Sequence, residues 1–466
     1  FKYRVLFLYN FSSIQFCIVT KQITINRIME EIESIENDQK IDSVNVGGLE
    51  EVQSSDPAVM KSTSLGSLLS DSEHVQDLLV KVEDPEKHIE GYVSYYVLTK
   101  TTRSEYDQPN YAVRRRYQDF LWLRQRLEES FPTHVIPPLP EKNSFTKHFD
   151  RFSEEYLKIR QDALNRFVTR VSSHPVLSFS EHFKIFLTAK TWELMTAKKL
   201  APSIMSRMGD SMKHTASSMM LKTREKEFND IAEFAKTFNE KISSVEKVTD
   251  KIARERFDLL ESYKDCIPVF RLWSNSEIKL GDPLNEVASA MEKNNEELKN
   301  LLKQQDAGIM EPLKEYILYI DAIKGALKRR DAKQMEYEVN VDELKRKKKE
   351  KEELEQSTQS RSFGVLIGSR DPEEVKKEKI DKLNATIEDL EQSVEAANDR
   401  AECANHDLKA DIERWHKNKR QDFKKLFTNY SESLIEYYKQ SLEAWNKALV
   451  KLESGSLNDD DLNGTD

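Results

Sequence analysis

Cysteine is scarce in this sequence: only Cys17, Cys266 and Cys403 occur in a chain of 466 residues. They lie far apart and lack the spacing of a metal-ligand set, so the sequence predicts neither a disulfide framework nor a zinc site. This scarcity is typical of proteins in a reducing, cytoplasmic setting. Glycine and proline are also few, with 12 and 13 residues, whereas 33% of the residues are charged. Such a composition favours long charged helices.

Short catalytic motifs are missing as well, among them the GxxxxGK phosphate loop and the HExxH, GxSxG and CxxC patterns. The sequence therefore predicts a protein that is not an enzyme and needs no cofactor or metal. Its net charge of −10 argues against nucleic acid as a partner. An interrupted apolar run near the start falls short of the roughly 20 apolar residues of a membrane-spanning helix.

The two ends of the chain differ from its middle. The first methionine is Met29, and we expect residues 1–28 to be a gene-model artefact. Residues 29–75 have the composition of a disordered acidic tail, and residues 453–466 form a second acidic tail. The two tails account for the net negative charge, so the part of the chain between them is close to neutral and is compatible with an anionic membrane as partner.

Three consecutive arginines, Arg114, Arg115 and Arg116, end a segment rich in β-branched and aromatic residues. Such composition is typical of strands, and helical spacing of apolar residues begins directly after it. Guanidinium groups match phosphate oxygens bidentately, and the adjoining Tyr117 could place its ring against a sugar-like ring. The segment is a candidate anion site, although an isolated basic triplet is more often a solvated surface.

A proline-rich loop follows at Pro137 to Pro140, and then an amphipathic stretch with Arg160 and Phe167. The order Arg-Tyr-x-x-Phe, Pro-Pro-Leu-Pro-x-Lys and an arginine seven residues before Phe167 resembles the phox-homology (PX) domain of sorting nexins that bind phosphatidylinositol 3-phosphate. The proline loop also fits a ligand of an SH3-type groove, but folded-looking sequence flanks it.

The resemblance implies an α+β PX domain, a three-stranded sheet plus helices, over residues 76–190. It also implies the site residues: Arg116 for the 3-phosphate, Tyr117 for stacking on the inositol ring, Lys142 for the phosphate next to the glycerol, and Arg160 for the ring hydroxyls. Arg114 and Arg115 are outside this implied set, and one of them is expected to be a solvated or fold-stabilising charge.

From Phe228 onward, apolar residues recur at alternating steps of three and four, the near-heptad pattern of a coiled coil. Breaks near Gly281 and Asp371 divide the pattern into three helices, each on the order of 110 Å long. Asp282 and Pro283 are predicted to cap and begin the second helix.

Helices of such length must pack along one another as a bundle or coiled coil. Pro268 and Pro312 fall inside the first two helices and are expected to bend them. Long, bent, three-helix arms after a PX domain resemble a BAR domain. The resemblance implies an all-α dimerisation and membrane-curvature domain of three long coiled-coil helices over residues 223–452.

Between the two domains, residues 191–222 are predicted to be an amphipathic linker helix. Its candidates for membrane contact are Lys198, Lys199, Ile204, Met205, Arg207 and Met208. Packing of this stripe against its own domain is an equal alternative. Lys345, Arg346 and Lys347, near the end of the second long helix, could contact anionic lipid at an arm tip, with about 1 kcal/mol from each residue. Because glutamates interrupt this run, a solvated helix face is the alternative.

Within the sorting nexins, the run Glu181 to Ala189 and the segment Val113 to Leu123 look closest to sorting nexins seven and thirty. This resemblance implies a peripheral protein on the cytosolic face of early or recycling endosomes, with roles in recycling and autophagy. It implies another PX-BAR sorting nexin as partner, either a heterodimer with a sorting nexin four-like protein or a homodimer. The alternative is a protein scaffold with a PX-like fold that does not bind lipid.

Overall fold

The structure is a computed structural model that describes residues 77–141, 153–199, 221, 224–356 and 372–454. By their contacts these residues lie in a single unit that extends from Gln76 to Asp466. None of the described helices combines the length and the apolar character that crossing a bilayer requires.

The predicted three-stranded sheet is confirmed. It is antiparallel, in the order β1-β2-β3, and consists of β1 (Leu78–Lys87), β2 (Val93–Thr101) and β3 (Asn110–Arg116). In register, Val82 lies opposite Val97, which in turn lies opposite Val113. Alternate residues of β1 are buried, because successive side chains of a strand point to opposite faces.

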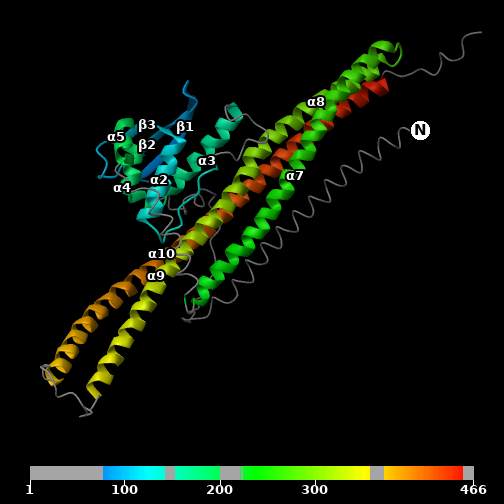
Figure 1. The fold of residues 1–466 in the computed structure, drawn as a ribbon. Helices are drawn as coiled ribbons and strands as arrows, with labels where there is room; N and C mark the ends of the chain where they lie inside the picture. Colours follow the sequence, from blue (N-terminus) through cyan, green and yellow to red (C-terminus); the bar gives the residue numbers. More distant parts are fainter. Residues whose placement is uncertain (1–76, 142–152, 200–220, 222–223, 357–371, 455–466) are drawn as a thin grey trace, which may run out of the picture. The chain divides into compact units, whose positions relative to one another are not determined.

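Helices cover this sheet (Figure 1). They are α2 (Tyr117–Ser130), α3 (Glu154–Ser172), the short 3₁₀ turn η1 (Leu177–Phe179), α4 (Glu181–Thr188) and α5 (Thr191–Lys199). The apolar positions of α2 that predicted a helix, Phe120, Leu123 and Leu127, are fully buried. They share one core with Phe167 of α3 and Phe186 of α4, so the sheet and its helices form one packed domain.

The outer edge of β1 is covered by α3. The Val82 N–H donates to Asn165 Oδ1 at 2.8 Å, and the Val82 carbonyl accepts from Gln161 Nε2 at 3.2 Å. Side-chain amides of the helix therefore satisfy backbone groups that a neighbouring strand would otherwise pair.

The helical part of the chain contains three long helical stretches, as predicted. They are α7 (Lys226–Ser276); α8 (Gly281–Gln305), which continues through a π-helical turn, η2 (Asp306–Met310), into α9 (Glu311–Gln356); and α10 (Pro372–Ser454). Aromatic rings join them: Trp415 of α10 lies 5.6 Å from Phe238 of α7 and 6.0 Å from Tyr316 of α9, measured between ring centroids.

The second long helix departs from the expected pattern in two places. It begins at Gly281, so the prediction that Asp282 caps it was wrong; a Cβ at Gly281 would approach Ser274 O to 2.8 Å, which makes glycine the residue that fits. Its π-helical turn ends at Met310, two residues before Pro312. Because Pro312 has no N–H to donate to the Gly308 carbonyl, the regular hydrogen-bond pattern cannot continue there. Pro268, by contrast, lies inside α7.

Candidate phosphate-binding site

The three arginines at the end of β3 have different environments, because strand residues alternate in direction. Arg115 points inward and is 1% exposed. Its guanidinium donates to the carbonyls of Phe186, at 2.8 Å, and of Ala189. Burial lowers the pKa of Arg115 to about 10. It thus joins β3 to the end of α4 and is the fold-stabilising charge that the sequence suggested.

Arg114 is also engaged within the fold. Its guanidinium forms ion pairs with Asp84, at 2.5 Å, and with Glu86, at 3.0 Å. Asp84 has a φ of 50°, and the β1–β2 register shifts at this point. Arg114 therefore holds an irregular part of β1 and is not available to bind a ligand without breaking these pairs.

Arg116 is exposed and lies at the junction of β3 and α2. Its backbone N–H donates to Asp119 Oδ2 at 2.6 Å, which fixes the start of the helix. Its guanidinium lies 3.5 Å above the ring of Tyr92. Among the residues that the structure describes, no carboxylate lies within ion-pair distance of this guanidinium, so its N–H donors are available to an anion.

Tyr117 and Arg160 come together although 43 positions separate them. The Arg160 guanidinium lies 4.6 Å from the Tyr117 ring centroid and 5.0 Å from that of Tyr156, and Arg160 is buried. The proline loop closes this group: Tyr117 donates its hydroxyl hydrogen to Pro140 O at 2.5 Å, and Arg160 donates to Glu141 O at 2.9 Å. Burial raises the pKa of the Tyr117 hydroxyl, which therefore stays protonated and can donate.

The structure thus brings Tyr117 and Arg160 together with the proline loop, and Arg116 directly precedes Tyr117 at the end of β3. Lys142, the fourth predicted residue, lies outside the described residues. Tyr92 is a site residue that the sequence motifs do not predict; its ring lies under the Arg116 guanidinium and stacks on His88 at 4.3 Å between ring centroids. An aromatic residue just before a strand is a weak signal, because it is also common in ordinary sheet packing.

The predicted membrane-contact residues are only partly described. Ile204, Met205, Arg207 and Met208 lie outside the described residues. On α5, Lys198 forms an ion pair with Asp119, the residue that fixes the start of α2. The exposed residues Trp192, Met195 and Lys199 recur at helical spacing on the other side of this helix, whereas Leu194 is buried. Lys198 therefore packs against its own domain, and the exposed face includes Lys199.

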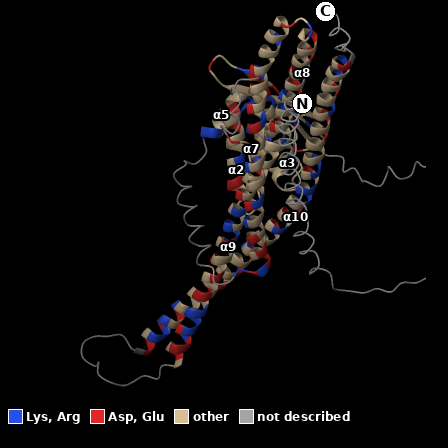
Figure 2. Ribbon diagram, turned by 90° about the vertical axis from the view of Figure 1, so that its right-hand side faces the viewer, with Lys and Arg blue, Asp and Glu red and all other residues tan. Residues whose placement is uncertain are grey.

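The basic run on α9 is largely neutralised. Arg346 pairs with Glu343 at 2.5 Å and Lys347 with Glu350 at 2.8 Å, whereas Lys345 is exposed. Figure 2 shows acidic and basic residues interspersed along these ends of α9 and α10. Their arrangement is that of a solvated helix face, the alternative reading of the sequence.

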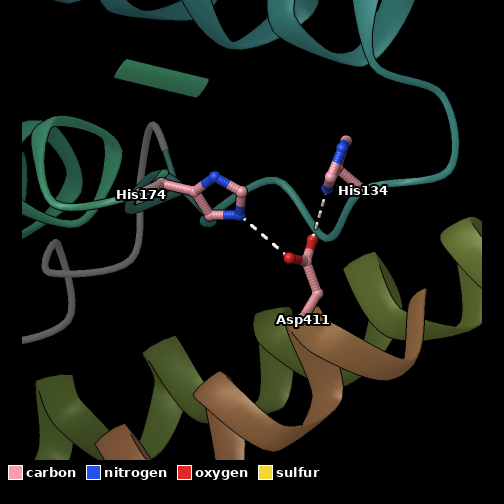
Figure 3. A group of neighbouring side chains, drawn as sticks. All are labelled: His134, His174 and Asp411. Carbon is pink, nitrogen blue, oxygen red and sulfur yellow. Dashed lines mark hydrogen bonds and ion pairs between the residues drawn. The ribbon is translucent and has the colours of Figure 1, made fainter. Parts of the chain in front are cut away.

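One group of described side chains, His134, His174 and Asp411, has the composition of a metal-ligand set (Figure 3). Its geometry does not fit a metal. His174 Nδ1 accepts the N–H groups of Val176 and Leu177, each at 3.1 Å. The proton of the neutral imidazole must then be on Nε2, whereas a metal bound at Nε2 would require it on Nδ1. The guanidinium of Arg414 lies 3.1 Å from Nε2 and already supplies the positive charge.

Comparison with known proteins agrees with this architecture. Residues 103–190 match the PX domain model, and residues 203–451 match the model described as Vps5 C terminal like. Human sorting nexin-30 is 39% identical over 381 residues, which cover 81% of this chain and 78% of the relative. Human sorting nexin-7 is 37% identical over 384 residues, which cover 82% and 90%.

A more distant relative is sorting nexin-4 of Emericella nidulans, 27% identical over 80% of this chain and 82% of its own length. Among solved structures, the cryo-EM structure of the SNX-BAR Mvp1 tetramer has a similar fold. It matches with a TM-score of 0.55 at 17% identity, covering 79% of this chain and 99% of that one. The sheet with its helices, the three long helical stretches and these relatives together show that the chain belongs to the PX-BAR sorting nexins, a family of membrane-binding proteins of intracellular trafficking.

Proposed function

We propose that this chain binds phosphatidylinositol 3-phosphate on endosomal membranes and that its helical domain senses or forms curved tubules in protein recycling and autophagy. In this proposal the chain acts without catalysis. Arg116 binds the 3-phosphate, Tyr117 and Arg160 contact the inositol ring, and Lys142 binds the phosphate next to the glycerol.

The observation that carries the proposal is the state of Arg116. Its two neighbours use their guanidinium groups within the fold, whereas Arg116 is exposed, supported by Tyr92 and not paired with any described carboxylate. A guanidinium held by an aromatic ring keeps its planar fork oriented for two phosphate oxygens. Tyr117 directly follows Arg116 at the start of α2, and Arg160 lies against the Tyr117 ring; the proposal assigns these two side chains to the inositol ring.

The test is sedimentation of the purified chain with liposomes that contain or lack phosphatidylinositol 3-phosphate. Arg116→Ala should weaken binding by about 10- to 100-fold, because a hydrogen bond to a charged group contributes roughly 1.5–3 kcal/mol. Arg116→Lys keeps the charge but loses the fork, and it should bind with intermediate affinity.

Lys100→Ala is the matched control, because Lys100 is an exposed basic residue on β2 of the same domain. It should pellet like the wild type. If pelleting depends neither on the lipid nor on Arg116, the phosphoinositide site is wrong, and a protein scaffold becomes the better description.

We further propose that the partner is another PX-BAR sorting nexin, either a sorting nexin-4-like chain or a second copy of this one. Apolar side chains are exposed where α7 ends and α10 ends, among them Leu272, Trp273, Leu442 and Val450. These two ends flank the start of α8 (Figure 1), and Lys451 pairs with Glu286 there. Such a surface is of the kind that a helical partner covers.

A further inference from the structure

The PX domain contacts α9 and α10 through polar groups. Thr133 donates to Asp407 at 2.8 Å, Arg166 pairs with Glu315 at 2.7 Å, and Arg170 pairs with Glu315 and, at 2.6 Å, with Asp422. Arg329 of α9 donates to Pro132 O. An interface of directed hydrogen bonds and ion pairs fixes an orientation more closely than apolar contact does, because each bond requires its own geometry.

The centre of this interface is Asp411, whose side chain is 2% exposed. Four donors surround its carboxylate: His134 Nδ1 at 3.1 Å, the Val135 N–H at 2.7 Å, His174 Nε2 at 2.9 Å and Arg414 at 2.5 Å. Figure 3 shows the two histidines reaching Asp411 from the PX side. We call these five residues the Asp411 clasp.

The Asp411 clasp holds a buried, charged carboxylate. Burial alone would raise the pKa of Asp411, but the hydrogen bonds from His134 and His174 outweigh it and hold this pKa well below its usual range. The carboxylate is therefore charged. Three of its four donors, from His134, Val135 and His174, belong to the PX domain. Separation of the PX domain from α10 would remove all three and leave Arg414 as the remaining partner of Asp411 in the clasp.

Helix α3 connects the clasped interface with the proposed lipid pocket, the candidate site of Arg116, Tyr117 and Arg160. It carries Arg160, which lies against Tyr117, and, within its next three turns, Arg166 and Arg170, which bind α9 and α10. A helix is a stiff element with a fixed rise of about 1.5 Å per residue. The pocket and the interface therefore move as one body as long as the clasp is closed.

We propose that the Asp411 clasp is a positioning device that fixes the phosphoinositide pocket relative to the α9–α10 helices. A membrane bound at Arg116 then meets these helices in one orientation. This inference rests on the proposed lipid function for its consequence, but the fixed orientation itself exists without lipid and is tested without it.

The experiment measures the distance between spin labels by pulsed electron resonance on the full chain, without lipid. Labels are attached through Lys100→Cys on β2 and Arg420→Cys on α10, both exposed positions, after Cys17, Cys266 and Cys403 are replaced by serine. Excess unlabelled chain removes distances between subunits. The parent should give a single narrow distance peak, and Asp411→Ala should lose it and give a broad distribution.

His134→Ala removes a donor of the clasp from the PX side and should broaden the distribution in the same way, which guards against an Asp411 variant that fails to fold. Glu413→Gln is the matched control on α10, since Glu413 is exposed, and it should keep the narrow peak. A narrow peak in both Asp411→Ala and His134→Ala would overturn the proposal.

Binding of the soluble headgroup of phosphatidylinositol 3-phosphate separates this proposal from the previous one. Asp411→Ala should bind the headgroup as the wild type does while its distance distribution broadens. Arg116→Ala should lose the headgroup and keep the narrow peak. If the distance distribution broadens in Asp411→Ala but no variant, and not the wild type either, binds the headgroup, the positioning device stands and the lipid site is wrong. If Asp411→Ala is the one variant that loses headgroup binding while Arg116→Ala keeps it, the clasp acts on the pocket itself and its positioning role is overturned.

Discussion

At the scale of single residues, Glu311 is a carboxyl group with an unusual titration. It is buried at the start of α9, and its nearest cation is Lys314 at 3.3 Å. Burial raises the pKa of Glu311 to about 7, against the opposing effect of Lys314. The folded chain therefore binds this proton more tightly than the unfolded chain does, between the unfolded pKa near 4.5 and the folded pKa.

The sign of the resulting pH dependence follows from linkage. Because the folded state binds more protons in this window, the contribution of Glu311 to the free energy of unfolding is greatest below pH 4.5 and falls as pH rises to 7, by up to about 1.4 kcal/mol per pH unit. Glu311→Gln mimics the protonated acid and should remove this loss. The melting temperature of Glu311→Gln minus that of the wild type should be larger at pH 8 than at pH 5.

Thermal unfolding of the two chains from pH 5 to pH 8, followed by circular dichroism, measures this difference. Glu352→Gln is the matched control, because Glu352 is exposed on the same helix, and its difference from the wild type should not vary with pH. A pH-independent difference for Glu311→Gln would show that Glu311 is ionised throughout the range.

The environments of single residues were the least predictable feature from the sequence, because they depend on segments far away in the chain. The strand pattern predicts that neighbouring arginines point to opposite faces, but which of them meets acceptors depends on α4 and its C-cap, whose carbonyls lie 71 and 74 positions from Arg115. The same is true of Arg160 and Tyr117. Family resemblance named both as site residues, whereas their contact with each other depends on the packing of α3.

At the scale of elements, α3 depends on its N-cap, Ser153, which directly precedes the helix. Ser153 Oγ accepts the Tyr156 N–H at 3.2 Å, and removal of such a cap costs about 1 kcal/mol. Ser153→Ala should therefore loosen the first turn of α3. Its amide hydrogens, including that of Tyr156, should exchange faster in a mass-spectrometric exchange experiment.

Ser153→Asp keeps an acceptor at the cap, and it should exchange like the wild type. Arg160 lies about two turns further along the same helix, so Ser153→Ala should also weaken binding of the lipid headgroup, by less than Arg116→Ala does. Unchanged exchange in Ser153→Ala would show that other contacts hold this turn.

For the helices, too, the sequence predicted their existence but not their local geometry. Apolar spacing predicted three long helical stretches, and an interior proline predicted a disturbance of the second. The form of that disturbance, a π-helical turn over Asp306–Met310, depends on how the chain relaxes around Pro312. The spacing of apolar residues does not distinguish an α-helical turn from a single π-helical turn.

At the scale of the whole molecule, the exposed apolar end of the helices predicts association. Leu272 is 70% exposed on α7, and burying a leucine side chain is worth about 1.5–3 kcal/mol. Leu272→Glu should therefore weaken the proposed association, with a second copy of this chain or with a sorting nexin-4-like chain, by at least about 10-fold. Sedimentation velocity over a concentration series measures the dissociation constant.

Val339→Glu is the matched control, because Val339 is 50% exposed on α9, away from this end of the helices. It should leave the dimer unchanged. Equal dissociation constants for Leu272→Glu and the wild type would place the dimer interface elsewhere.

The domains could be recognised from the sequence because each carries its own local pattern: alternation in the strands, heptad spacing in the helices and three short motifs around the pocket. Contacts between the domains leave no such pattern. His134, His174 and Asp411 are separated by 40 and 237 positions, and each of them, taken singly, resembles an ordinary polar residue. The contacts between the two domains could therefore not be predicted from the sequence and are seen in the structure.

The amides of α3 on β1 limit which ligands this sheet can take. A peptide that extends a sheet must pair with the free N–H and C=O groups of an edge strand. At Val82 both groups are already bonded, to Asn165 and Gln161, and the two amides belong to the helix that also carries Arg160. Strand addition at this position would have to displace α3 and with it Arg160, so a peptide bound there and a phosphoinositide at the proposed site would compete without sharing a single contact.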